Sequence, residues 1–409
     1  MSPAAARREG WAAFRHRDFT LYFTSRFASG LAIQMQNVAV GWRVYDLTGD
    51  PLALGLVGLA GFLPAICLAL VTGHVADRFD RRSVLMVCYA VATLTGIGLF
   101  LHELLGSTAV WPIYLLTLAY GTARAFANPA GQALLPTLVP PVDFRNAVAW
   151  NSSGWQTATI AGPALGGILY ALGGMVVFGA AAATYALTAL LVALIRPRGA
   201  SAGREKPSWA SLVAGILFIR SRPAILGAIS LDLFAVLLGG ATALLPIYAR
   251  DILLVGPLGL GVLRSMPAVG AVLMALLLAQ RPLERHSGRR MLLAVAVFGI
   301  ATIVFGLSSN LYLSLACLFV LGAADMISVY VRQTLVQLET PDAMRGRVAA
   351  VNAVFIGASN ELGEFESGVV AALVGPVAAV VLGGVGTIAV AALWARCFPA
   401  LRDRDRLVP

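Results

Sequence analysis

Charge is scarce in this sequence. Asp, Glu, Lys and Arg make up 12% of its 409 residues and apolar residues make up 59%, whereas soluble domains typically carry about 25% charged residues. Apolar stretches of about 20 residues, long enough to cross a ~30 Å hydrocarbon layer, recur from Phe19 to Phe398. This composition excludes an ordinary soluble protein. It predicts an all-α, polytopic membrane protein with about twelve transmembrane helices. In chain order the predicted spans lie near residues 19–44, 52–76, 83–105, 111–136, 147–171, 176–195, 224–247, 257–279, 291–308, 311–333, 347–374 and 377–398.

Cofactor and metal motifs are also missing. The four cysteines form no CxxC pair, the four histidines fall in predicted loops or at span ends, and no GxxxxGK phosphate loop occurs. We therefore expect no cofactor, no metal, no disulfide framework and no direct use of ATP. Active transport would have to draw on a transmembrane gradient.

The basic residues that are present gather in alternate loops and give a formal net charge of +10. The outer turns hold almost none beyond Arg43 and Arg250. Because Lys and Arg favour cytoplasmic loops, both termini are predicted to be cytoplasmic. This topology accounts for the positive charge without a nucleic-acid partner. Residues 1–18 lack the apolar core and cleavage site of a signal peptide, so the first span is expected to direct insertion.

The second half of the sequence repeats the plan of the first. PLALG at 51–55 corresponds to PLGLG at 257–261, and one gapless offset of 201 residues pairs Gly121, Gly162 and Gly167 with glycines. A polar segment, RPRGASAGREKPSW, separates the halves. We therefore predict a cytoplasmic N-terminus (1–18), a six-helix bundle (19–195), a cytoplasmic linker (196–223), a second six-helix bundle (224–398) and a cytoplasmic C-terminus (399–409).

Two motifs in the first half point to a known superfamily. GHVADRFDRR, residues 73–82, resembles the inner-loop signature G-x-x-x-D-R-x-G-R-R of the major facilitator superfamily, with Asp80 in place of the second glycine, which weakens the turn. AGPALGG, residues 161–167, resembles the antiporter motif GPxxGG of the same superfamily. FANPAGQALLPTLVP, SNELGEFESG and FPALR are similar to its branch of drug and siderophore exporters, which includes the enterobactin exporter. The resemblance covers essentially the whole chain and implies two pseudo-symmetric six-helix bundles.

The loop motif is a candidate gate. Topology alone would account for its arginines but not for the carboxylate of Asp77. The resemblance implies that Asp77 contacts the start of the eleventh helix and stabilises the outward-open state. The residues of this candidate gate are Gly73, Asp77, Arg78, Arg81 and Arg82.

The antiporter motif is a candidate packing and rocking element. Glycines let helix backbones approach closely, and a proline inside a helix removes one amide donor and bends it. Packing alone would explain these residues, and the resemblance adds a conformational role between the two halves. They are Gly162, Pro163, Gly166 and Gly167.

Three carboxylates occupy the eleventh predicted span, namely Glu361, Glu364 and Glu366. Counted from Arg347, Glu361 lies about 21 Å along the helix, in the outer half of the membrane. An ionised carboxylate there costs at least about 2.5 kcal/mol, so we expect these groups to be protonated, paired or facing water. Arg264 in the eighth span is the expected partner, and proton coupling is the expected role. The structural alternative is a helix interface or a position near the outer surface.

A second set of intramembrane charges relates the two halves. Arg26 aligns with Asp232, and Arg124 aligns with Asp325. The resemblance places their helices, spans one, seven, four and ten, around a central cavity. Because isolated charges are costly in the membrane, we expect them to pair across the cavity or with substrate, as an inner gate or a substrate clamp. A purely structural pair inside the bundle is the alternative.

Together these features predict a monomeric secondary transporter rather than an enzyme, whose partners are protons, the lipid bilayer and a small-molecule substrate. A proton-coupled exporter of an amphipathic molecule, such as a siderophore or a drug-like compound, is favoured. A lysophospholipid flippase or another uniporter is the alternative among transporters. An intramembrane enzyme would need neighbouring catalytic groups, and a receptor would leave both motifs unexplained.

Overall fold

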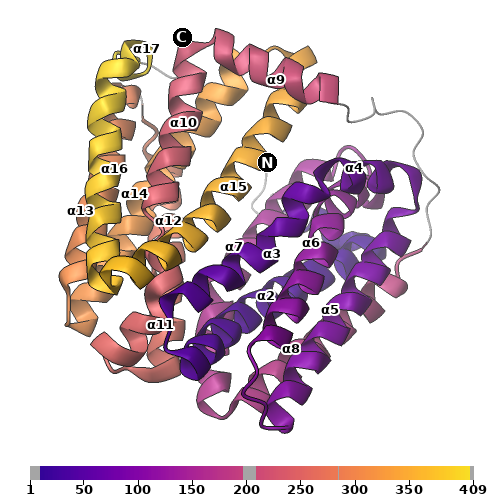
Figure 1. Cartoon of the computed structure of the whole chain (residues 1–409). Helices are drawn as coiled ribbons and strands as arrows, with labels where there is room; N and C mark the ends of the chain where they lie inside the picture. The colour runs from indigo at the N-terminus through magenta and orange to yellow at the C-terminus, as the bar shows by residue number, and fades with distance from the viewer. Residues whose placement is uncertain (1–9, 197–208, 284, 406–409) are drawn as a thin grey trace. The chain divides into compact units, whose positions relative to one another are not determined.

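A computed structural model describes residues 10–196, 209–283 and 285–405, and every regular element in those ranges is helical, as the hydropathy predicts (Figure 1). The helices group into two compact units. Unit 1 is drawn from Met1–Arg43 and Ala60–Pro207, and unit 2 from Val44–Leu59 and Ser208–Pro409. Residues 44–59, which join the first two predicted spans, therefore cluster with unit 2.

The first predicted bundle corresponds to one short turn and seven helices. The predicted second span is divided at Leu68, four residues after Pro64. A proline inside a helix removes one backbone hydrogen bond and bends the chain, which accounts for the division. The elements are η1 (Ala12–Arg15), α2 (Arg17–Thr48), α3 (Pro51–Cys67), α4 (Ala69–Arg78), α5 (Arg81–Leu104), α6 (Trp111–Leu138), α7 (Phe144–Ala171) and α8 (Gly174–Ala193).

The remaining elements belong to unit 2. Long helices cover the predicted spans eight to twelve, and shorter elements follow α10 and α16. They are α9 (Trp209–Ser221), α10 (Pro223–Leu238), η2 (Ala241–Leu244), α11 (Leu245–Ile247), the π-helical η3 (Tyr248–Ile252), α12 (Gly256–Gln280), α13 (Ser287–Leu307), α14 (Leu311–Glu339), α15 (Asp342–Val374), α16 (Pro376–Cys397) and α17 (Pro399–Arg402).

The seventh predicted span, residues 224–247, is not one continuous helix. α10 ends at Leu238, and two glycines precede η2. A Cβ added at Gly240 would lie 2.6 Å from the carbonyl oxygen of Gly363 on α15. Only glycine permits this approach, so the backbone of α15 packs directly on the bend.

The predicted cytoplasmic linker contains a helix, α9, that its polar composition did not reveal. A Cβ added at Gly215 of α9 would lie 2.9 Å from the carbonyl oxygen of Arg347. α9 therefore packs against the start of α15 within unit 2 (Figure 1).

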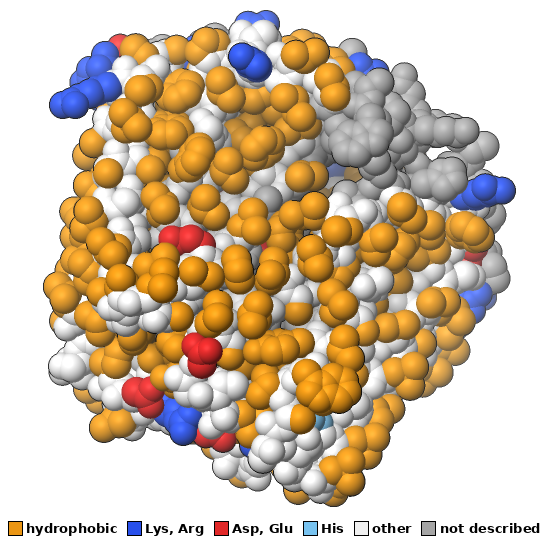
Figure 2. Space-filling view, viewed as in Figure 1, with side chains coloured by type: hydrophobic (Ala, Val, Ile, Leu, Met, Phe, Trp, Pro, Cys, Tyr) orange, Lys and Arg blue, Asp and Glu red, His pale blue; other side chains and the backbone are white. Residues whose placement is uncertain are grey.

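The surface and composition of the helices agree with a membrane setting. Seven helical stretches among the described residues are long and apolar enough to cross a bilayer. α2, α6 and α15 fall outside this set, and each carries charges that the sequence analysis singled out. Hydrophobic side chains cover most of the visible face of each unit (Figure 2).

The predicted repeat has a structural counterpart inside each unit. In unit 1, Gly162 of α7 packs against α2, where an added Cβ would meet the side chain of Gln34 at 2.5 Å. In unit 2, Gly363 of α15 packs against α10, with an added Cβ 3.0 Å from the carbonyl oxygens of Val236 and Leu237. The fifth and eleventh predicted spans thus use aligned glycines to contact the first helix of their own half.

Candidate functional site

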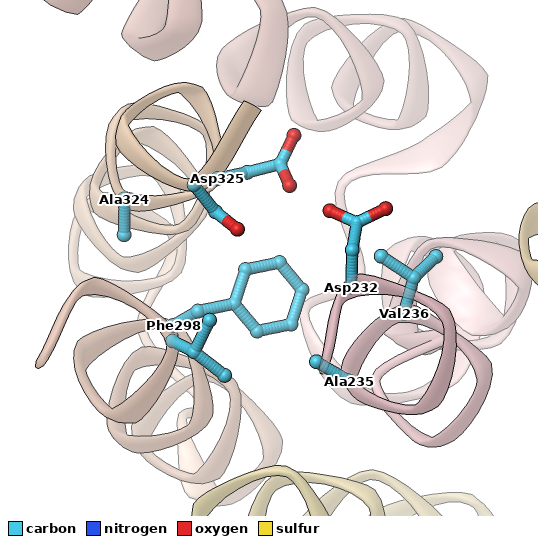
Figure 3. A pocket seen from close by; sticks show the side chains of 8 residues that line it. Asp232, Ala235, Val236, Phe298, Ala324 and Asp325 are labelled. Carbon is cyan, nitrogen blue, oxygen red and sulfur yellow. The ribbon is translucent and has the colours of Figure 1, made fainter. Parts of the chain in front are cut away.

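The two aspartates predicted in the second half meet in a small cavity of unit 2. Asp232 lies on α10 and is 6% exposed, and Asp325 lies on α14. Both carboxyl groups point toward one space beside the ring of Phe298 (Figure 3). The cavity holds about 10 Å³, roughly the room of one water molecule, and most of its remaining lining is apolar.

A buried arginine completes this acidic site. Arg332 of α14 is 2% exposed, and its Nη2 lies 3.3 Å from Oδ2 of Asp232. Its Nη1 donates a hydrogen bond of 3.1 Å to Oδ1 of Asn352 on α15. The sequence analysis did not single out Arg332. Its spacing of seven residues from Asp325 was a usable signal, because two helical turns bring such residues onto one face.

The charges at this site do not balance when both aspartates are ionised. Asp325 lies within electrostatic reach of both Asp232 and Arg332. One guanidinium can neutralise one carboxylate, and a second ionised carboxylate beside it is opposed by its like-charged neighbour. The charges of the site therefore balance when the two aspartates hold one proton between them.

The two arginines predicted in the first half also meet in one pocket, within unit 1. Arg26 of α2 and Arg124 of α6 line a cavity of about 20 Å³, and none of its lining residues is acidic. The guanidinium of Arg26 lies 5.9 Å from the ring centre of Trp155 on α7, in a cation–π contact. The other polar lining residues are Ser29, Cys88, Tyr89, Tyr120, Asn128 and Tyr185. This arginine pocket is a cationic, aromatic environment suited to an anion.

The predicted pairing of Arg26 with Asp232 stays a prediction, because the two residues belong to different units and each unit is described by itself. Asp232 nevertheless has an ion-pair partner inside its own unit in Arg332. The alternative of a structural pair within a bundle therefore gains a concrete candidate.

The glutamate cluster lies on the continuous helix α15, and its three members are partly buried. Arg264 of α12 is within electrostatic reach of Glu364 and Glu361. A Cβ added at Gly58 of α3 would lie 3.0 Å from Oε2 of Glu364, so this carboxylate rests against the backbone of α3 inside unit 2. Glu366 points to a different side of the helix by its spacing from Glu361.

The loop motif binds helix ends through its arginines. Arg81 donates a 3.0 Å hydrogen bond to the carbonyl oxygen of Ala133, and Arg82 donates to the carbonyl oxygens of Val192 and Ala193 in the last turn of α8. A cation at a helix C-terminus satisfies exposed carbonyls and favours the helix dipole. Gly73 is partly buried and Arg78 is exposed. The side chain of Asp77 is outside the described residues, so its gating role stays a prediction.

The expectation that Asp80 weakens the turn was wrong. Asp80 has φ −58°, which any residue adopts, and its carboxylate accepts hydrogen bonds from Ser83 N (3.0 Å) and Ser83 Oγ (2.7 Å). Asp80 is therefore the N-cap of α5, a position that aspartate favours.

The antiporter motif forms the contact of α7 with α2 inside unit 1. All four of its singled-out residues are buried. A Cβ added at Gly166 would lie 2.9 Å from Cα of Met35, so the two backbones touch. This supports close packing as one role of the motif.

The two arginines predicted to lie at the outer surface have acidic partners that the sequence analysis did not assign. Arg43 Nε lies 2.7 Å from Glu103 Oε1, with side chains only 15% and 12% exposed. Arg250 Nη2 lies 3.4 Å from Asp46 Oδ1, and the hydroxyl of Tyr45 donates to Asp251 beside it. Each of these two cations is therefore balanced by a carboxylate, in keeping with a predicted position away from the basic loops.

Comparison with known proteins identifies the family. The chain matches the transmembrane secretion effector family of the major facilitator superfamily over residues 8–407. It is 30% identical over 381 residues to the enterobactin exporter of Citrobacter koseri, and the aligned region covers 92% of this chain and 91% of that protein. It is 28% identical over 381 residues to the enterobactin exporter of Escherichia coli O1:K1, with the same coverage.

Solved structures agree on the fold. The nucleoside transporter NupG is similar with a TM-score of 0.72 at 18% identity, covering 93% of this chain and 99% of that chain. This confirms the predicted all-α fold of two six-helix bundles. The matched family consists of transporters, which excludes the alternative that this protein is an intramembrane enzyme. The chain therefore belongs to the transmembrane secretion effector family of the major facilitator superfamily and is a multi-pass secondary transporter.

Proposed function

We propose that this transporter works as a monomer in the bacterial inner membrane, with both termini cytoplasmic, and exports an anionic amphipathic molecule in exchange for protons. The observation that carries the proposal is the charge count at the acidic site, where Asp232 and Asp325 share one guanidinium. A group that must gain or lose a proton to balance its surroundings is suited to coupling.

Protonation of Asp325 would act through Arg332. With a proton on Asp325, Asp232 and Arg332 form a neutral pair. Once Asp325 releases that proton, both carboxylates compete for Arg332. Arg332 also donates a hydrogen bond to Asn352 of α15. A proton on α14 therefore changes the contacts of α10 and α15, and α15 also carries the glutamate cluster.

Substrate charge is inferred from the arginine pocket. Two guanidinium groups that line one pocket attract an anion, and Trp155 with the three lining tyrosines favours a flat or aromatic group. The curated relatives are exporters of enterobactin, a siderophore. A siderophore-like or drug-like anion is the substrate class that we propose on these grounds.

Proteoliposomes with an imposed pH gradient test the proposal. Accumulation of an anionic catecholate siderophore should follow the gradient in the parent protein. Asp325→Asn should abolish gradient-driven accumulation while leaving exchange of substrate down its own gradient. Asp50→Asn is the matched control, because Asp50 is exposed and an asparagine keeps the acceptor that caps Leu52 N.

Gradient-driven transport that survives Asp325→Asn would refute this coupling role. Movement that ignores the pH gradient in the parent protein would instead favour a uniporter or a lysophospholipid flippase.

A further inference from the structure

A wide apolar groove lies on unit 1, beside the arginine pocket. It encloses about 460 Å³ between α4, α5 and α6, within the range of pockets that hold drug-sized ligands. Val87 is 64% exposed and Phe79 is 55% exposed, so the groove opens at the surface. α5 is one of the stretches long and apolar enough to cross a bilayer, so an apolar opening on α5 suits a surface in contact with lipid. Val91 of α5 and Phe126 of α6 also line it.

Two small side chains separate this groove from the arginine pocket. Cys88 of α5 and Ala123 of α6 line both cavities. Arg124, next to Ala123 in sequence, lines only the arginine pocket. The side chains of Cys88 and Ala123 thus form a thin wall between the two cavities. For a molecule bound in the groove, the buried arginines lie directly behind this wall.

One end of the groove meets the loop motif. Phe79 and Ser83 line the groove, and Asp80, Arg81 and Arg82 lie between them in sequence. The two arginines donate hydrogen bonds to helix carbonyls, and Asp80 caps α5. Topology predicts that this loop lies at the cytoplasmic surface, which places this end of the groove at the inner leaflet. The groove therefore combines an apolar interior with a cationic end beyond the wall.

We infer that this groove is a lateral entry site for the substrate from the inner leaflet. This inference rests on the proposed function, the export of anionic amphipathic molecules. The apolar part of the substrate occupies the groove against Val87, Val91 and Phe126, and its anionic group reaches Arg124 past Cys88 and Ala123. The bulk at positions 88 and 123 then sets which substrates pass.

Photo-crosslinking in liposomes tests this site with the full chain. The probe is a dodecyl sulfonate with a diazirine at the end of its chain, and the comparison probe is the uncharged dodecyl alcohol with the same diazirine. We expect sulfonate adducts on residues 84–91 and 119–126, competed by an anionic catecholate siderophore. Equal labelling by the alcohol would overturn the inference, because the groove would then be an ordinary lipid-facing surface.

Matched tryptophan variants sharpen the test. Val87→Trp fills the exposed side of the groove and should reduce sulfonate labelling about tenfold, since losing the burial of one apolar group of about valine size is worth about that factor. Leu94→Trp is the control, because Leu94 is 66% exposed on the same face of α5, two turns further on, and does not line the groove. Ala123→Leu thickens the wall and should slow transport of the catecholate without removing labelling in the groove. Equal effects of Val87→Trp and Leu94→Trp would overturn the inference.

These experiments distinguish failure of the entry site from failure of the proposed function. Labelling needs no pH gradient, so groove adducts with uncoupled transport would reject proton exchange and keep the entry site. Proton-coupled transport that is unchanged in Val87→Trp and Ala123→Leu would reject the entry site and keep the exporter.

Discussion

Replacing Arg332 with methionine would leave the carboxylate of Asp232 in a dry site without its ion-pair partner. The side chains of Arg332 and Asp232 are 3% and 7% exposed, so solvent screens their interaction little. Removing one member of a buried pair costs about 3–5 kcal/mol. At about 2–4 °C per kcal/mol for a domain of this size, the unfolding midpoint should fall by about 6–20 °C. Thermal unfolding of the purified protein, followed by intrinsic fluorescence, measures this loss.

The double variant Asp232→Asn with Arg332→Met separates charge from packing. It removes both charges together, so it should recover a large part of the loss seen in Arg332→Met alone. Acid should also lessen the defect of Arg332→Met, because protonation of Asp232 removes the unpaired charge. Arg289→Met is the control for a surface pair, since Arg289 is 62% exposed and lies 3.9 Å from Asp403. A double variant less stable than the single one, or a single variant as stable as the parent, would refute the reasoning.

Three further changes follow from other contacts. Gly166→Leu should push α7 from α2, because a Cβ there already lies 2.9 Å from Cα of Met35, and should lower both the folded yield in detergent and transport. Arg124→Gln should raise the KM of an anionic substrate about tenfold or more, because a charge-assisted contact is worth about 1.5–3 kcal/mol. Arg124→Lys keeps the charge and should raise the KM less. Equal KM values for the parent protein and Arg124→Gln would contradict an anion site. Glu103→Gln should lower the unfolding midpoint by weakening the 2.7 Å pair with Arg43, and an unchanged midpoint would show that this pair adds no stability.

The sequence was sufficient to find the helices and most intramembrane charges, because burying a charge in lipid is costly enough to make each such residue informative. The repeat aligned Arg26 with Asp232 and Arg124 with Asp325. The two aspartates share one cavity, and the two arginines share another. Hydropathy could not reveal the break after α10, since that break depends on Gly240 meeting the backbone of α15.

The interaction partners of the charged residues were harder to predict than their positions in the helices. Arg332 lies near the predicted cytoplasmic end of its span, where arginines are expected for topology. Composition therefore did not reveal its pairing with Asp232, and its spacing from Asp325 was the usable signal. Asp80 differs from the resembled motif, yet it caps α5 through a local contact with Ser83 that the motif does not describe. The lateral groove depends on the packing of three helices and leaves no periodic signal in the sequence.

The central claim is that Asp232 and Asp325 hold one exchangeable proton between them, because the guanidinium of Arg332 can balance only one carboxylate. Infrared spectroscopy of the purified protein detects protonated carboxyl groups directly through their carbonyl band, without any need for a substrate. The account predicts a buried, protonated carboxyl band in the parent protein that Asp325→Asn removes and Asp50→Asn leaves in place. A parent spectrum without that band, or an unchanged band in Asp325→Asn, would contradict it.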